Sequence, residues 1–167
     1  MKYNISKVTK IIEGGKERSD SVYFGLLAVD QKTDVVVIHD GARPLIAPHT
    51  ISQAILGLHE CDGTVVAVPV TNTIKESFSC NQQIMVHHTL NREHLWSVQT
   101  PQVFRYKILL QALSQAQQEG FSGTDDASYV EHYGGKIKII QGSYKNRKIT
   151  TPEDIRIAEV LVSLDYH

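Results

Sequence analysis

The sequence predicts an α/β fold with an open, mostly parallel sheet, in a single domain that spans residues 1–167. Short runs rich in β-branched residues, such as 34–38 and 63–70, alternate with amphipathic helical segments. Residues 35–38 form a continuous apolar run, as expected for a strand that helices cover on both faces of the sheet. A length of 167 residues is typical of one domain with its own core.

The first half of the chain alternates strands with helices. Residues 8–12 are expected to form a short strand that ends at two glycines, and a helix over 19–29 follows. A strand at 34–38 leads into a polar loop. Pro48 is expected to open the next helix, which extends to about residue 60, because proline is well tolerated in the first helical turn.

The second half predicts a protruding arm and then further strands and helices. Residues 71–92 indicate two strands, near 73–75 and 85–90, joined by a polar turn. A two-stranded arm is marginally stable alone, so we expect it to pack on a partner. The other expected elements are an extended segment at 97–104, a helix at 106–118, a helix at 125–133 capped by Thr124, strands at 136–140 and 148–149, and a last helix opened by Thr151 and Pro152.

The composition excludes several classes of function. The chain is 41% hydrophobic and 21% charged with a net charge of −1, so it has no basic field for nucleic acid or for a membrane surface. No apolar run is long enough to span a bilayer. The two cysteines form no CxxC pair, which favours a cytoplasmic protein with reduced thiols. The eight histidines show no metal-binding spacing, so no protein metal site is expected.

Polar side chains follow several of the expected strands. In open α/β sheets, ligands bind beyond the carboxyl ends of the strands. The candidates in those positions are Asp40, Arg43, Thr71, Thr73, Thr100 and Lys148. A carboxylate, two cations and several hydroxyls suit a phosphorylated polyol and a metal-bound nucleotide. Each also has a structural alternative, since aspartate is common in turns and threonine is common in strands.

Six segments carry a more specific signal. In chain order, they resemble the motifs GGxxRxxSV, VHDAARP, PVxDTIK, DRxxLWxxQTPQxF, TDDAS and NxKITTPED, at residues 14–22, 37–44, 69–75, 91–104, 124–128 and 146–154. By these segments the chain resembles the bacterial 2-C-methyl-D-erythritol 4-phosphate cytidylyltransferases, from residue 12 to residue 160.

This resemblance implies a Rossmann-like nucleotidyltransferase fold. It also implies cytidylyl transfer from CTP to 2-C-methyl-D-erythritol 4-phosphate in non-mevalonate isoprenoid precursor synthesis, with Mg²⁺ bound mainly through the CTP phosphates. The implied nucleotide-binding residues are Gly15, Ser19, Ser21, Asp40 and Gly41. The implied polyol-phosphate residues are Thr73, Arg92, Thr100, Thr124 and Lys148. Asp40 and Lys148 are the implied catalytic residues, and Arg92 would act on the partner subunit of a homodimer.

The chain departs from the family pattern in two ways. Lys16, Gly41, Asn72 and Asn91 replace residues that are usual in the family, three of them aspartates. The sequence also lacks the usual first strand, glycine-rich loop and helix, so we expect the carboxy-terminal three quarters of such an enzyme, inactive alone. Two alternatives are a pentitol-phosphate enzyme, acting on ribitol 5-phosphate, and a non-catalytic module that binds a partner through its arm or its open sheet edge.

Overall fold

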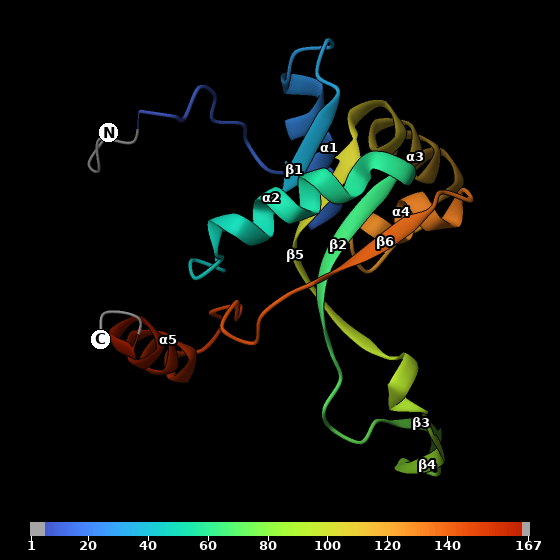
Figure 1. Ribbon diagram of the computed structural model, residues 1–167. Coiled ribbons are helices and arrows are strands. Elements are labelled where there is room, and N and C mark those ends of the chain that lie inside the picture. The colour runs from blue at the N-terminus through green and yellow to red at the C-terminus, as the bar shows by residue number, and fades with distance from the viewer. Residues whose placement is uncertain (1–5, 165–167) are drawn as a thin grey trace.

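A four-stranded sheet forms the centre of the protein (Figure 1). The computed structural model describes residues 6–164. The strands of this sheet are β1 (Val35–Ile38), β2 (Gly63–Pro69), β5 (Trp96–Arg105) and β6 (Ile137–Gln141), in the spatial order β1-β5-β2-β6. The predicted α/β class is confirmed.

The prediction of a mostly parallel sheet is wrong for β5. This strand runs antiparallel to both of its neighbours, β1 and β2, so only the β2–β6 pairing is parallel. The chain leaves β2 at Pro69 and returns along β5 at Trp96, which pairs with Pro69 across the sheet. Because no helix crosses over the sheet between these two strands, the returning strand is antiparallel.

Helices cover both faces of the sheet. The helices α1 (Arg18–Ala28), α3 (Tyr106–Glu119) and α4 (Asp126–His132) pack on one face, where Phe104 and Leu109 are fully buried. The helix α2 (Pro48–Leu56) and the 3₁₀ turn after it (Gly57–Glu60) pack on the other, against Val103. Val103 and Phe104 point to opposite faces because side chains alternate along a strand.

Two helices begin with reciprocal capping boxes, and the cap of the second differs from the one expected. Glu17 is the N-cap of α1, and the side chain of Asp20 accepts a hydrogen bond from its amide at 3.1 Å. Asp125, not Thr124, is the N-cap of α4 and accepts from the Ser128 amide at 2.9 Å. The Ser128 hydroxyl in turn lies 3.3 Å from the Asp125 amide, so this reciprocal capping box satisfies two orphan amides at once.

Two predicted strands do not form. Residues 8–12 lie outside any helix or strand, and Ile11 is 80% exposed. Residues 148–149 also form no strand, although the Ile149 amide donates to the Ala42 carbonyl oxygen at 2.8 Å. A strand needs a neighbour that satisfies its successive amides and carbonyls, and neither segment lies in a sheet.

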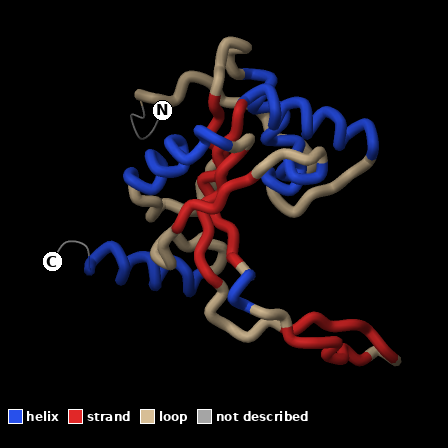
Figure 2. The backbone as a smooth tube through the Cα atoms, turned by 45° about the vertical axis from the view of Figure 1, so that its right-hand side comes forward, coloured by secondary structure: helices blue, strands red, loops and turns tan. Residues whose placement is uncertain are grey.

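The remaining elements lie apart from the central sheet (Figure 2). The strands β3 (Lys75–Cys80) and β4 (Gln83–Thr89) form a separate antiparallel hairpin in which every residue is exposed. Its turn is formed by Asn81 and Gln82, which both have positive φ angles. The helix α5 (Pro152–Leu164) follows β6 and buries only Ala158. Among residues 6–164, no helix has the length and apolarity needed to cross a membrane.

Candidate functional site

A single carboxylate, that of Asp40, gathers three cations beyond the carboxyl end of β1. Its Oδ2 lies 3.2 Å from Lys148 Nζ and 3.4 Å from Arg43 Nε, and its Oδ1 lies 3.6 Å from Arg18 Nε. The cations come from the start of α1, from the loop after β1 and from the segment between β6 and α5. Asp126 also pairs with Arg18, so two carboxylates face the three cations, and the cluster keeps a net positive charge that attracts an anion.

The surroundings of Asp40 favour its ionised form. Partial burial opposes ionisation, but the hydrogen bond and charge of Lys148, with the charges of Arg18 and Arg43, outweigh it. The pKa of Asp40 is therefore held below its ordinary value. At neutral pH the carboxylate keeps the cations in place before a ligand arrives.

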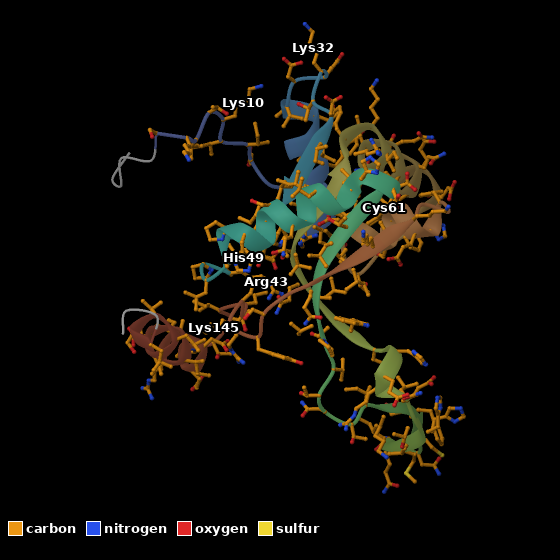
Figure 3. All side chains as sticks on the ribbon, viewed as in Figure 1. Lys10, Lys32, Arg43, His49, Cys61 and Lys145 are labelled. Atoms are coloured by element: carbon orange, nitrogen blue, oxygen red, sulfur yellow. The ribbon has the colours of Figure 1, made fainter. Side chains whose placement is uncertain are left out.

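Two hydrogen bonds fix the loop after β1 relative to β5. The Asp40 amide donates to Thr100 Oγ1 at 3.0 Å, and the same hydroxyl lies 3.0 Å from His39 Nδ1. Arg43 Nη1 donates to the Asn146 carbonyl oxygen at 2.9 Å. Figure 3 accordingly shows Arg43 beside the chain that leads from β6 to α5. Asp40 is thus tied to β5, and Arg43 ties the same loop to the segment that carries Lys148.

Arg18 has a second carboxylate partner. Its Nη1 and Nη2 donate to the two oxygens of Asp126 at 2.9 and 2.7 Å, and the side chain of Asp126 is fully buried. Burial raises the pKa of Asp126, and Arg18 opposes that shift. Neither residue was named from the sequence as a site residue, although Arg18 lies in the segment between the implied residues Gly15 and Ser19. Both lie within quoted motifs, but their 108-residue separation leaves no local pattern that joins them.

Two cavities adjoin the side of the cluster that holds Lys148. The first, of about 340 Å³, is lined by all four charged residues of the cluster and by Thr100 and Thr124. The second, of about 440 Å³, is lined by Thr71, Arg147 and Lys148 among others. The structure therefore brings together Asp40, Thr100 and Lys148, which were candidates from the expected strands, and Thr124, which only the resemblance implied.

A third cavity, of about 680 Å³, lies between α1 and β1. Ser21 and Gly41, both implied nucleotide residues, line it together with Arg18 and Asp40. Ser21 also accepts a hydrogen bond from the Gly15 amide at 3.1 Å, which fixes the turn before α1. Ser19 lies in the first turn of α1, partly exposed, and is not among the residues that line this cavity.

Thr73 and Arg92 lie toward the hairpin. Thr73 is exposed in the connection between β2 and β3 and lines none of these three cavities. Arg92 is exposed, and its Nη1 donates to the Thr71 carbonyl oxygen at 2.6 Å. Arg92 therefore lies beside the 440 Å³ cavity without lining it. Contact between Arg92 and a substrate in a partner subunit stays a prediction.

The donor set does not suit direct coordination of a metal by the protein. Within residues 6–164, no group of three histidine, cysteine or acidic side chains could hold an ion. Asp40 is already surrounded by three cations, which would repel a divalent ion placed against it. This arrangement fits Mg²⁺ only as an ion that enters on the phosphates of a nucleotide.

Comparisons with known proteins agree on one family. The sequence profile of the 2-C-methyl-D-erythritol 4-phosphate cytidylyltransferases matches residues 2–164. Proteins of that name from Pelotomaculum thermopropionicum and Alkaliphilus oremlandii are both 49% identical to this chain, over 95% and 96% of its length. The chain spans only 65% and 66% of those two relatives.

Solved structures give the same result. A 4-diphosphocytidyl-2C-methyl-D-erythritol synthase from Anaerococcus prevotii superimposes with a TM-score of 0.84 at 29% identity, covering 92% of this chain and 70% of that one. The Francisella tularensis 2-C-methyl-D-erythritol 4-phosphate cytidylyltransferase gives a TM-score of 0.83 at 30% identity, covering 95% and 74%. With the profile match and two relatives at 49% identity, this chain belongs to the 2-C-methyl-D-erythritol 4-phosphate cytidylyltransferase family.

Proposed function

We propose that this chain carries the substrate-binding part of a cytidylyltransferase that joins CTP to 2-C-methyl-D-erythritol 4-phosphate. One observation carries the proposal: Asp40 holds three cations at the boundary between two cavities. The 680 Å³ cavity would take the cytidine, and the 340 Å³ cavity would take the polyol phosphate. Both substrates are anionic, and both phosphates would reach the same cations.

In the proposed reaction, an oxygen of the polyol phosphate attacks the α-phosphorus of CTP. A new P–O bond forms, the bond from the α-phosphorus to the β-phosphate bridging oxygen breaks, and pyrophosphate leaves. Such transfers depend on positioning and on charge neutralisation. Lys148 and Arg43 would hold the attacking phosphate, Thr100 and Thr124 would contact the polyol, and Asp40 would orient the cations. Mg²⁺, bound through CTP, would neutralise charge on the triphosphate and on the leaving pyrophosphate.

The nucleotide side would use the turn before α1. Gly15, Ser19, Ser21 and Gly41 would contact the cytidine, with Ser21 and Gly41 facing the cavity directly. CTP is an intracellular nucleotide, so the proposal includes a cytoplasmic location. The sequence contains no glycine-rich phosphate loop, and we infer that these 167 residues alone bind substrates but do not transfer the cytidylyl group.

The proposal includes a homodimer formed through the β3–β4 hairpin. Every hairpin residue is exposed, including Phe78, Ile84 and Met85, and an isolated two-stranded hairpin is marginally stable. In such a dimer Arg92, at the base of the hairpin, would reach the polyol phosphate of the partner, and Thr73 would lie beside it. In chains fused to an amino-terminal strand, glycine-rich loop and helix that restore activity, an Arg92→Ala chain mixed with an Asp40→Ala chain should then regain part of that activity, provided that the subunits exchange.

The test separates binding from transfer. By calorimetry, the chain should bind 2-C-methyl-D-erythritol 4-phosphate more tightly than ribitol 5-phosphate. With CTP and Mg²⁺ it should release no pyrophosphate, whereas fusion to an amino-terminal strand, glycine-rich loop and helix of the kind usual in the family should restore release. Binding of neither polyol phosphate, or equal binding of both, would contradict the proposed substrate. Transfer by the 167 residues alone would contradict the inferred need for a further segment.

A further inference from the structure

We propose that Asp126 is a positioning residue that holds Arg18 in place to bind the phosphate lying between the two substrate cavities. This inference rests on the function proposed above and adds two residues to it. Arg18 and Asp40 line both the 680 Å³ and the 340 Å³ cavity. A side chain at that boundary would contact the α-phosphate of the nucleotide, which the polyol phosphate attacks in the proposed reaction.

The geometry leaves Arg18 free to bind an anion. A guanidinium carries five N–H donors, and Asp126 accepts one from each of the two terminal nitrogens. The second hydrogen on each terminal nitrogen has no partner in Asp126. Within residues 6–164, the Nε–H has the carboxylate of Asp40 as its neighbour, at 3.6 Å between Nε and Oδ1, which is beyond hydrogen-bonding distance. Arg18 is 41% exposed, so a ligand in either cavity can reach these donors.

Asp126 is itself held rigidly. It is the first residue of α4, where the helix dipole favours a carboxylate. The Gln102 side chain connects this end of α4 to β5: its Nε2 donates to Asp125 at 2.7 Å, and its Oε1 accepts from the Ala127 amide at 3.1 Å. The hydrogen bonds of Gln102 thus fix Asp126 relative to β5, and Asp126 in turn fixes the guanidinium of Arg18.

A purely structural role would leave a different signature. The Arg18–Asp126 pair also joins α1 to α4, so its loss should lower stability in either case. If the pair only shapes the cavity, its loss should weaken CMP and cytidine binding equally. If Asp126 positions Arg18 for a phosphate, only CMP binding should weaken, because cytidine lacks the phosphate.

The experiment is a double-mutant cycle with CMP and cytidine as the two probes. Both affinities are measured by titration of the 167-residue chain, with its amide chemical shifts as the readout. The ratio of CMP to cytidine affinity should fall about tenfold in Arg18→Gln, because one charge-assisted contact to phosphate is lost. It should fall about three- to tenfold in Asp126→Asn. The double variant should match Arg18→Gln, because Asp126 acts only through Arg18. Asp126→Glu should recover part of the ratio, and Glu119→Gln, a carboxylate removed from the end of α3, should leave it unchanged.

Each outcome decides one point. An unchanged ratio in Asp126→Asn, or additive losses in the double variant, would overturn the positioning role alone. A wild-type chain that binds CMP no better than cytidine would overturn the proposed function and this inference together. If Asp126→Asn does not fold, the wild-type protein is sufficient: its Arg18 Nε–H resonance should shift with CMP and not with cytidine. Equal shifts with both probes would overturn the inference.

Discussion

Replacing Lys148 with alanine should weaken binding of 2-C-methyl-D-erythritol 4-phosphate. In the free protein, Lys148 Nζ lies 3.2 Å from Asp40 Oδ2, and the lysine side chain is 44% exposed. When a phosphate enters the 340 Å³ cavity, the ammonium would turn toward it from the cavity wall. The binding free energy lost in Lys148→Ala is therefore a difference: the interaction of the ammonium with the phosphate minus its interaction with Asp40 in the free protein.

The size of the effect follows from that difference. A hydrogen bond between an ammonium and a phosphate contributes about 1.5–3 kcal/mol. The half-exposed pair with Asp40 contributes about 0–1 kcal/mol, because solvent screens it. With mid-range values of about 2 and about 0.5 kcal/mol, the net loss is about 1.5 kcal/mol, which corresponds to an affinity about tenfold weaker.

Calorimetric titration of the 167-residue chain with the polyol phosphate measures this change directly. The matched control is Lys32→Ala, which removes the same charge from the turn between α1 and β1, well away from Arg43 in Figure 3. The affinity of the control should stay within twofold of the wild type. Equal weakening in both variants would mean that only the net charge matters. An unchanged affinity in Lys148→Ala would show that the cation does not contact the phosphate.

Three further predictions concern stability and assembly. Asp154 accepts hydrogen bonds from Thr150, Thr151 and Arg147, which hold its pKa far below the ordinary value. The ionised carboxylate therefore stabilises the folded state above about pH 4, and this contribution is lost as the pH falls further. The difference in melting temperature between the wild type and Asp154→Asn should accordingly be largest near pH 6 and shrink below pH 4; a constant difference would refute this. A Cβ on Gly15 would lie 2.1 Å from Asp20 Cβ, so Gly15→Ala should lower the free energy of unfolding by about 1–3 kcal/mol in urea titrations. A Cβ on Gly25 would meet open space, so Gly25→Ala in the helix α1 should raise the free energy of unfolding by about 0.5–1 kcal/mol. Sedimentation velocity at micromolar concentration should show a dimer that Phe78→Asp converts to a monomer, and a monomeric wild type would rule out the hairpin interface.

Local patterns predicted most of the elements. The apolar run at 63–70 and the helix after Tyr106 were found within one or two residues of β2 and α3, because their signals are contained within the segment. The strand expected at 8–12 was wrong for the opposite reason: β-branched residues allow an extended backbone, but only a neighbouring strand makes it part of a sheet. The direction of β5 was also beyond local reasoning, because it depends on the path of the chain through the hairpin.

The candidate site divides in the same way. Asp40 follows an expected strand, so the rule for strand ends identified it before any contact was known. Thr100 reaches the same edge because β5 runs antiparallel to β1, and Lys148 lies there without the strand that was expected at 148–149. The ion pair between Arg18 and the buried Asp126 joins the first residues of two helices that are far apart in the sequence. Each residue alone resembles an ordinary charge in the first turn of a helix, so only the folded chain shows the pair.

The position of β5 also bears on how the chain folds during synthesis. This strand joins β1 to the rest of the sheet, and Val35 pairs with Arg105. The ribosome releases β1, α2 and β2 before β5 exists, so β1 cannot enter the sheet until residue 105 has emerged. Pairings between distant segments close slowly, on the order of milliseconds to seconds. Until β5 arrives, the apolar strands β1 and β2 are exposed together, and a chaperone that binds extended apolar segments would find them in that interval.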